Sequence, residues 1–190
     1  EHIDSATTNS LDQLKSQREW VLSAYLSLTK DHQNELQKDK NLKTFFTSKS
    51  DEECGVAFNS LEEKMSKWLE PSGKVDSPDK NRIYNFVLLD SSTNRSYKNA
   101  IFATKRQHVM YKTAGVLHYA IWENGNIRIV SEDANSAFVP PCTLSVFSKQ
   151  YSFMPGSFMR WTQSDAEDYE REMISLFDWL KNNFGNERKN

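Results

Sequence analysis

The chain has 190 residues, which is the usual size of one compact domain. Its 24 basic and 26 acidic residues give a formal net charge of −2, which excludes a histone-like or polybasic protein. Six Gly, five Pro and 12% aromatic residues exclude a low-complexity chain, and no apolar run is long enough to cross a bilayer. We therefore expect a single domain over residues 1–190, soluble as given, with residues 1–9 and 186–190 frayed.

The first 70 residues carry helical patterns. Ser10 with Gln13, and Ser50 with Glu53, match the capping box, in which a hydroxyl and a side chain three residues later satisfy free backbone amides. Apolar residues spaced by three and four follow both boxes. We place a break near 39–41, which leaves a short helix ending at Phe45-Phe46, and we expect Pro71 to end the next helix.

A third helix is expected at the C-terminal end of the chain. Ser164 with Glu167 forms the same box, and Gly185 stands where a helix commonly ends. Its apolar stripe is made by Tyr169, Met173, Leu176, Phe177, Leu180 and Phe184.

Between residues 82 and 161 the pattern changes to the twofold alternation of strands. We expect strands at 82–90, 97–104, 108–113, 116–122 and 126–131, and a last hairpin from 143–147 and 158–161 that turns at Pro155-Gly156. The predicted fold is therefore α+β, with two or three N-terminal helices, a five- to seven-stranded mainly antiparallel sheet, and a C-terminal helix packed on one sheet face.

The dipeptide Asn124-Gly125 gives the strongest local signal, because it suits a two-residue hairpin turn. The turn places Trp122 opposite Ile127 and His118 opposite Ser131, with Tyr119 on the reverse face. Both faces of this hairpin are largely apolar. We expect helices to cover one face and something else, a partner or a ligand included, to cover the other.

Enzyme signatures are missing from the sequence. It has no glycine-rich phosphate loop, no HExxH and no GxSxG, so we predict no cofactor, no metal site and no catalytic residues, and we lean against an enzyme. We expect His108 near Trp122 rather than opposite His118, so no histidine pair is implied. Cys54 and Cys142 are either two separate thiols or one disulfide, and the sequence is compatible with both.

Two surface features are candidates for binding. Residues 81–114 carry six basic residues against one acid, whereas the helices at 51–70 and 165–184 each carry six acids against two bases. The segment 147–161 is rich in the aromatic, Met and Arg residues that interface centres favour. The alternative for the charges is that the basic and acidic segments face each other and neutralise one another within the protein. The alternative for segment 147–161 is that its aromatic residues pack in the core. The residues that we predict to bind a partner are Phe153, Met154, Phe158, Arg160, Trp161, Arg95, Lys105 and Arg106.

We expect a non-enzymatic protein-binding module, such as an inhibitor, an immunity factor or an extracytoplasmic component of an assembly or receptor. The alternative is a small-ligand sensor with a pocket between sheet and helices, lined by His118, Tyr119 and Trp122. The third is binding of an anion or single-stranded nucleic acid through 81–114, which the negative total charge disfavours. The chain begins at Glu1 without Met, so we expect a processed or cut form and slightly favour an extracytoplasmic location.

Overall fold

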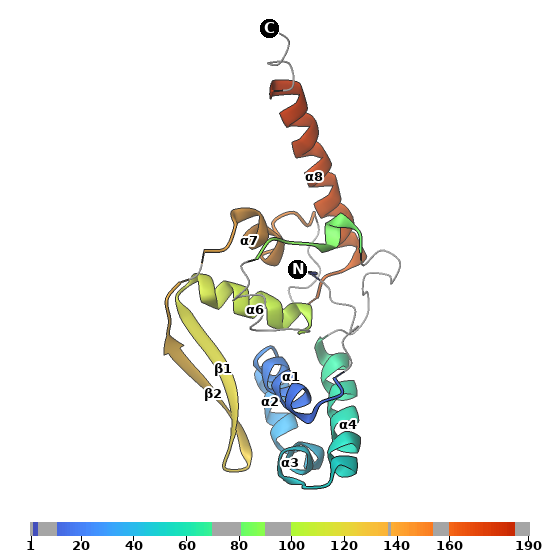
Figure 1. The fold of residues 1–190 in the computed structure, drawn as a ribbon, viewed down its shortest axis with the longest axis vertical. Helices are drawn as coiled ribbons and strands as arrows, with labels where there is room; N and C mark the ends of the chain where they lie inside the picture. The colour runs from blue at the N-terminus through green and yellow to red at the C-terminus, as the bar shows by residue number, and fades with distance from the viewer. Residues whose placement is uncertain are drawn as a thin grey trace.

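The computed structural model describes residues 2–3, 11–69, 81–89, 100–136, 138–153 and 160–184. Helices dominate this part of the chain, and the sheet it contains has two strands (Figure 1). The elements in chain order are α1 (Leu14–Leu26), α2 (Lys30–Gln37), α3 (Lys40–Thr47), α4 (Asp51–Leu69), the 3₁₀ turn η2 (Ile83–Asn85), α6 (Phe102–Thr113), β1 (Val116–Glu123), β2 (Asn126–Asp133), α7 (Pro141–Phe147) and α8 (Gln163–Phe184).

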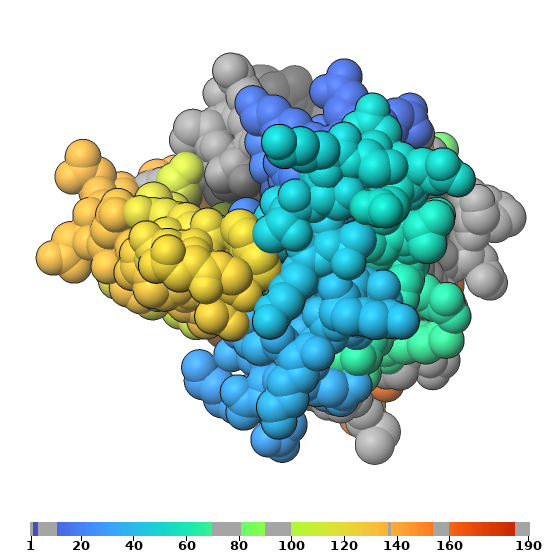
Figure 2. Space-filling model, turned by 90° about the horizontal axis from the view of Figure 1, so that it is seen from below, coloured from blue at the N-terminus to red at the C-terminus, as the bar shows by residue number. Residues whose placement is uncertain are grey.

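The N-terminal helices pack around one hydrophobic core. The predicted break is confirmed: α2 ends at Gln37, and Asp39 caps α3 by accepting a hydrogen bond from the Asn41 amide at 2.9 Å. Half of the Ser50–Glu53 box is confirmed, since the Ser50 hydroxyl accepts from the Glu53 amide at 3.3 Å. The other half is wrong, because the Ser50 amide donates to the Ser48 hydroxyl at 3.0 Å and the Glu53 carboxylate accepts from that hydroxyl at 2.6 Å. Seen from the end remote from α8, α2 and α3 lie beside the tip of the hairpin (Figure 2).

The β1–β2 hairpin has the predicted turn and register. Asn124 and Gly125 both have positive φ, at 51° and 80°, as a type I′ turn requires. Trp122 pairs with Ile127 and His118 with Ser131. Ala120 and Ile127 are buried in the core beside α1, whereas Leu117 on the opposite face is exposed. The hairpin is therefore covered on one face by helices.

The predicted strands at 97–104 and 108–113 are wrong, because residues 102–113 form α6. This helix lies between two hydrophobic cores: Ala103 belongs to the N-terminal core, and Phe102 and Val109 belong to a second core. A helix buried on two sides lacks the one-sided stripe by which a helix is recognised in sequence. The expected strand at 82–90 is also wrong, since η2 and an isolated bridge between His2 and Phe86 take its place.

The predicted strand at 143–147 is wrong as well, because Pro141–Phe147 form α7. Pro141 stands at the first helical turn, where its fixed φ and missing N–H suit a helix start. Trp161 lies in the segment that leads into α8 instead of in a strand. The expected turn at 155–156 and Phe158 lie outside the described residues.

The five- to seven-stranded sheet is thus replaced by a helical molecule with one two-stranded hairpin. The expected packing of the C-terminal helix on a sheet is wrong, since the first turns of α8 pack against η2 and the second core, and α8 then projects away from the body (Figure 1). Its cap is also two residues earlier than predicted, because the Thr162 hydroxyl accepts from the Asp165 amide at 3.2 Å. At the other end of the chain, α1 begins after Gln13, and Ser10 lies outside the described residues.

The second core joins α6, α7 and the first turns of α8. Ile3 is fully buried in it, and the Ile3 amide donates to the Asn85 carbonyl at 2.8 Å. No helix in the described ranges is long and apolar enough to cross a membrane.

Candidate protein-interaction surface

A buried ion pair fixes the root of α8. Lys149 Nζ lies 2.6 Å from Asp165 Oδ2, and the two side chains are 0% and 4% exposed. Asp165 also accepts hydrogen bonds from the Ser152 hydroxyl at 2.6 Å and from the amide and hydroxyl of Thr162 at 2.8 and 2.7 Å. The carboxylate thereby ties the end of α7 to the start of α8.

Burial and hydrogen bonding shift the pKa values of Asp165 and Lys149 in opposite directions. Burial raises the pKa of Asp165, but the bonds from Lys149, Ser152 and Thr162 outweigh it and hold that pKa below its usual value. Burial also lowers the pKa of Lys149, and the bond to Asp165 offsets this only in part. The hydrogen bonds therefore stabilise the charged form of Asp165, whereas burial still disfavours the charged form of Lys149.

The rest of α8 leaves the body with its apolar side chains uncovered. We call residues 174–184 the projecting half of α8; every one of them is exposed. The large apolar side chains here are between 44% and 65% exposed, and they are Ile174, Leu176, Phe177, Trp179, Leu180 and Phe184. A helix face with this composition is normally buried.

The uncovered face continues the face that packs on the body. Ala166 and Tyr169 are buried in the second core, and Met173 packs against it. Phe177, Leu180 and Phe184 follow at spacings of three and four residues, which keeps them on the same side of the helix. We call Leu176, Phe177, Leu180 and Phe184 the α8 stripe. The apolar face of α8 is thus continuous: the body covers it along the first turns of the helix, and it is exposed along the last turns.

Charge divides α8 in the same way. Its root half, residues 163–173, carries Asp165, Glu167, Asp168, Glu170 and Glu172 against the single base Arg171. The projecting half carries one acid, Asp178, and one base, Lys181. The α8 stripe is therefore an almost neutral apolar surface next to an acidic one.

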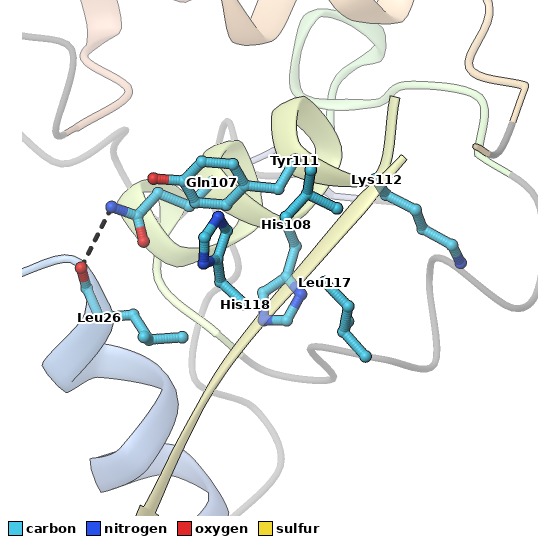
Figure 3. A pocket seen from close by; sticks show the side chains of 8 residues that line it. Leu26, Gln107, His108, Tyr111, Lys112, Leu117 and His118 are labelled. Atoms are coloured by element: carbon cyan, nitrogen blue, oxygen red, sulfur yellow. Dashed lines mark hydrogen bonds between the residues drawn. The ribbon is translucent and has the colours of Figure 1, made fainter. Parts of the chain in front are cut away.

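A small pocket lies between α6 and the start of β1. It has a volume of about 50 Å³, room for only a few water molecules, and Figure 3 shows the side chains that line it. His108 and His118 both line this pocket, so the prediction that they lie apart is wrong. The reason is that His108 stands on a helix that packs against β1. The ring centroids of Tyr111 and His118 lie 4.1 Å apart, and His118 Nδ1 lies 2.6 Å from the Ser131 hydroxyl oxygen.

The three residues predicted to line a ligand pocket do not converge. His118 lines the small pocket, whereas Trp122 stacks on Phe46 with ring centroids 4.6 Å apart. Tyr119 lies on the other face of β1, where its hydroxyl donates to Glu132. Ligand sensing stays a prediction, and the pocket between α6 and β1 has room only for something the size of a few waters. Within the described residues, no three His, Cys, Asp or Glu side chains gather in a way that could hold a metal ion.

The predicted partner-binding residues are scattered. Phe153 is 86% exposed at the α7–α8 connection, but Trp161 is 2% exposed and packs in the second core. Lys105 is fully buried and donates to the His2 carbonyl at 2.6 Å, and Arg106 donates to the Phe147 carbonyl at 2.9 Å. Arg160 is partly buried. Met154, Phe158 and Arg95 lie outside the described residues.

The exposed position of the α8 stripe is not among the sequence-based predictions, and Ile174 and Trp179 are not among the predicted binding residues. The periodicity identified most of these residues as one face, but it carries no information about what covers that face. Both cysteines are free thiols, with Cys54 buried and Cys142 exposed.

Comparison with known proteins adds no relative. No protein-family model, no curated protein and no solved structure matches this chain. The candidate surface therefore rests on the geometry of the chain itself.

Proposed function

We propose that this chain is a protein-binding module and that the projecting half of α8 is its docking element. The observation that carries the proposal is the exposure of six large apolar side chains on a helix that leaves the body. Exposed apolar patches larger than a few hundred Å² are rare on monomers and mark interaction sites. Helix-in-groove and helix-on-helix recognition both use apolar anchors at the spacing of the α8 stripe.

A protein partner fits this surface better than a membrane does. Amphipathic helices that bind membrane surfaces carry Lys and Arg on their polar faces, because biological membranes are negatively charged. The projecting half of α8 has a single base, Lys181, balanced by Asp178, and the root half beside it is acidic, so α8 lacks the cationic face that attracts an anionic bilayer. The aromatic and aliphatic residues of the stripe are instead typical of the centre of a protein interface.

Position-specific photo-crosslinking tests the proposal in cells that make the protein. In the full-length chain, Phe177 is replaced with p-benzoylphenylalanine, and in a matched control Ser175 is replaced in the same way. Both positions are exposed on the same two turns of α8 but face opposite sides of the helix. We expect a discrete protein adduct from position 177 and none from position 175.

A second substitution, Leu180→Asp, is then added to the chain that carries the photoprobe at position 177. It places a carboxylate in the stripe and is expected to remove the adduct, because an unpaired charge opposes burial. Equal labelling from positions 175 and 177, or no adduct from either, would overturn the proposal.

A further inference from the structure

We infer that the occupant of the α8 stripe is a second copy of this chain, bound so that the two α8 helices run antiparallel. This inference rests on the proposed function, because it names the partner of the same surface. Two properties of α8 carry it: the side of the helix on which the body lies and the division of charge. The area of the stripe then sets how strong the contact can be.

The position of the body sets the orientation. Ala166 and Tyr169 show that the body lies on the stripe side of the helix root. In a parallel pair, each body would occupy the space that the partner's helix root needs. In an antiparallel pair, the root of each helix lies beyond the tip of the other, and the two projecting halves can overlap along about 16 Å.

Charge favours the same orientation. A parallel pair would place the five acids of one root half beside the five acids of the other. An antiparallel pair directs Lys181 of each chain toward the acidic root half of its partner. The contact is then isologous, which means that both chains use the same surface, the α8 stripe.

The exposed area of the stripe limits the strength of the dimer. A large apolar side chain presents roughly 200 Å² when it is fully exposed, so the four side chains of the α8 stripe, at about half exposure, offer roughly 440 Å². Two copies would bury about 900 Å², which lies in the range of weak, transient interfaces, below the roughly 1,200 Å² of stable ones. We therefore expect a reversible dimer whose population depends on concentration.

Sedimentation equilibrium of the purified full-length chain tests the dimer. We expect a mass that rises with concentration toward twice the 22.1 kDa of one chain. Leu180→Asp is expected to weaken self-association by about tenfold or more, which is typical of a charge placed at an interface centre. Ser175→Asp adds the same charge on the opposite face and is the matched control; it should leave the dimer unchanged.

Cross-linking tests the orientation. Glu172 and Asn183 are eleven residues apart, which is about three turns, so they lie on the same flank of the stripe. Glu172→Cys and Asn183→Cys chains, each also carrying Cys142→Ser to remove the exposed native thiol, are mixed and treated with a short bis-maleimide. An antiparallel dimer gives adducts between position 172 of one chain and position 183 of the other.

The outcomes separate this inference from the proposed function. A chain that stays monomeric, a dimer that Leu180→Asp does not weaken, or adducts mainly between two copies of position 183 would each overturn the antiparallel self-association. An adduct from position 177 whose mass fits a different protein would also overturn it, while leaving the proposed function standing.

Discussion

Lys149 occupies a backbone conformation that usually selects glycine. Its φ is 57°, and the chain here closes α7 with the paired bonds of a Schellman motif, from the Lys149 amide to the Val146 carbonyl and from the Gln150 amide to the Ser145 carbonyl. A lysine at this position is disfavoured by its Cβ. Its ammonium group compensates by reaching Asp165 and by lying 5.6 Å above the Phe102 ring.

The first prediction follows from that arrangement. Asp165→Asn leaves the Lys149 ammonium buried without its carboxylate, so we expect the free energy of unfolding to fall by about 3–5 kcal/mol. Lys149→Met should cost less, because Asp165 keeps the bonds from Ser152 and Thr162. Urea unfolding monitored by circular dichroism measures both.

The exposed pair Lys67–Glu63 provides the control for this comparison. Its side chains are about 70% exposed, and Lys67→Met should change stability by no more than about 1 kcal/mol. Equal effects of Asp165→Asn and Lys67→Met would show that the buried pair does not fix the root of α8.

The second prediction concerns pH. Burial, with the nearby Lys112 charge, lowers the pKa of His108 below its ordinary value. The unfolded chain therefore binds a proton at a higher pH than the folded one, and stability is lost as the pH falls below about 6.5. His108→Gln should reduce the drop in urea midpoint between about pH 7.5 and 5.5.

Lys112 supplies a second arm of the same experiment. Because burial is the larger cause of the shift, Lys112→Met should reduce the pH-dependent drop by less than His108→Gln does. The explanation fails if His108→Gln has the same pH dependence as the unsubstituted chain.

At the scale of elements, the hairpin and α6 show what sequence patterns can and cannot reveal. The hairpin was predictable because its information is local: Asn124-Gly125 sets the turn, and the turn sets the register. Helix α6 was not predictable in this way, because neighbours on both sides determine its burial. Lys105 illustrates the difficulty, since a lysine reads as a surface residue and yet its side chain is fully buried.

The third prediction concerns how the hairpin edge is protected. The Gln37 side chain of α2 donates to the Ile127 carbonyl at 2.7 Å and accepts from the Ile127 amide at 3.1 Å, as a neighbouring strand would. Gln37→Ala removes both bonds, together with the one that Gln37 donates to the Tyr25 hydroxyl at 3.0 Å, so we expect a loss of about 1–2 kcal/mol and faster hydrogen exchange at Ile127.

Asn34→Ala, on an exposed position of the same helix, is the matched control and should leave the exchange of β2 unchanged. If Gln37→Ala and Asn34→Ala gave equal exchange rates at Ile127, the edge of β2 would not depend on Gln37.

At the scale of the whole molecule, α6 joins two cores into one body. The Ser27 and Thr104 hydroxyls lie 3.2 Å apart, and Gln107 donates to the Leu26 carbonyl at 3.2 Å, so the end of α1 is tied to the middle of α6. The apolar face of α8 was predictable from its spacing. Its exposure depends on where the second core ends, and no local pattern contains that information.

The last prediction is that stability depends on the segment that leads into α8, whereas binding depends on the projecting half of α8. Trp161 is 2% exposed and packs against Phe102 and Tyr169, so Trp161→Ala should cost about 3–5 kcal/mol of unfolding free energy. Phe177→Ala removes an exposed side chain and should change the free energy of unfolding by no more than about 0.5 kcal/mol in dilute solution.

Raising the protein concentration should stabilise the unsubstituted chain but not the Leu180→Asp chain, because association stabilises the folded state by mass action. Chemical denaturation at low and high protein concentration measures all three effects. A large loss from Phe177→Ala in dilute solution would mean that the stripe packs against its own body, and the surface assigned here to a partner would then be part of the monomer core.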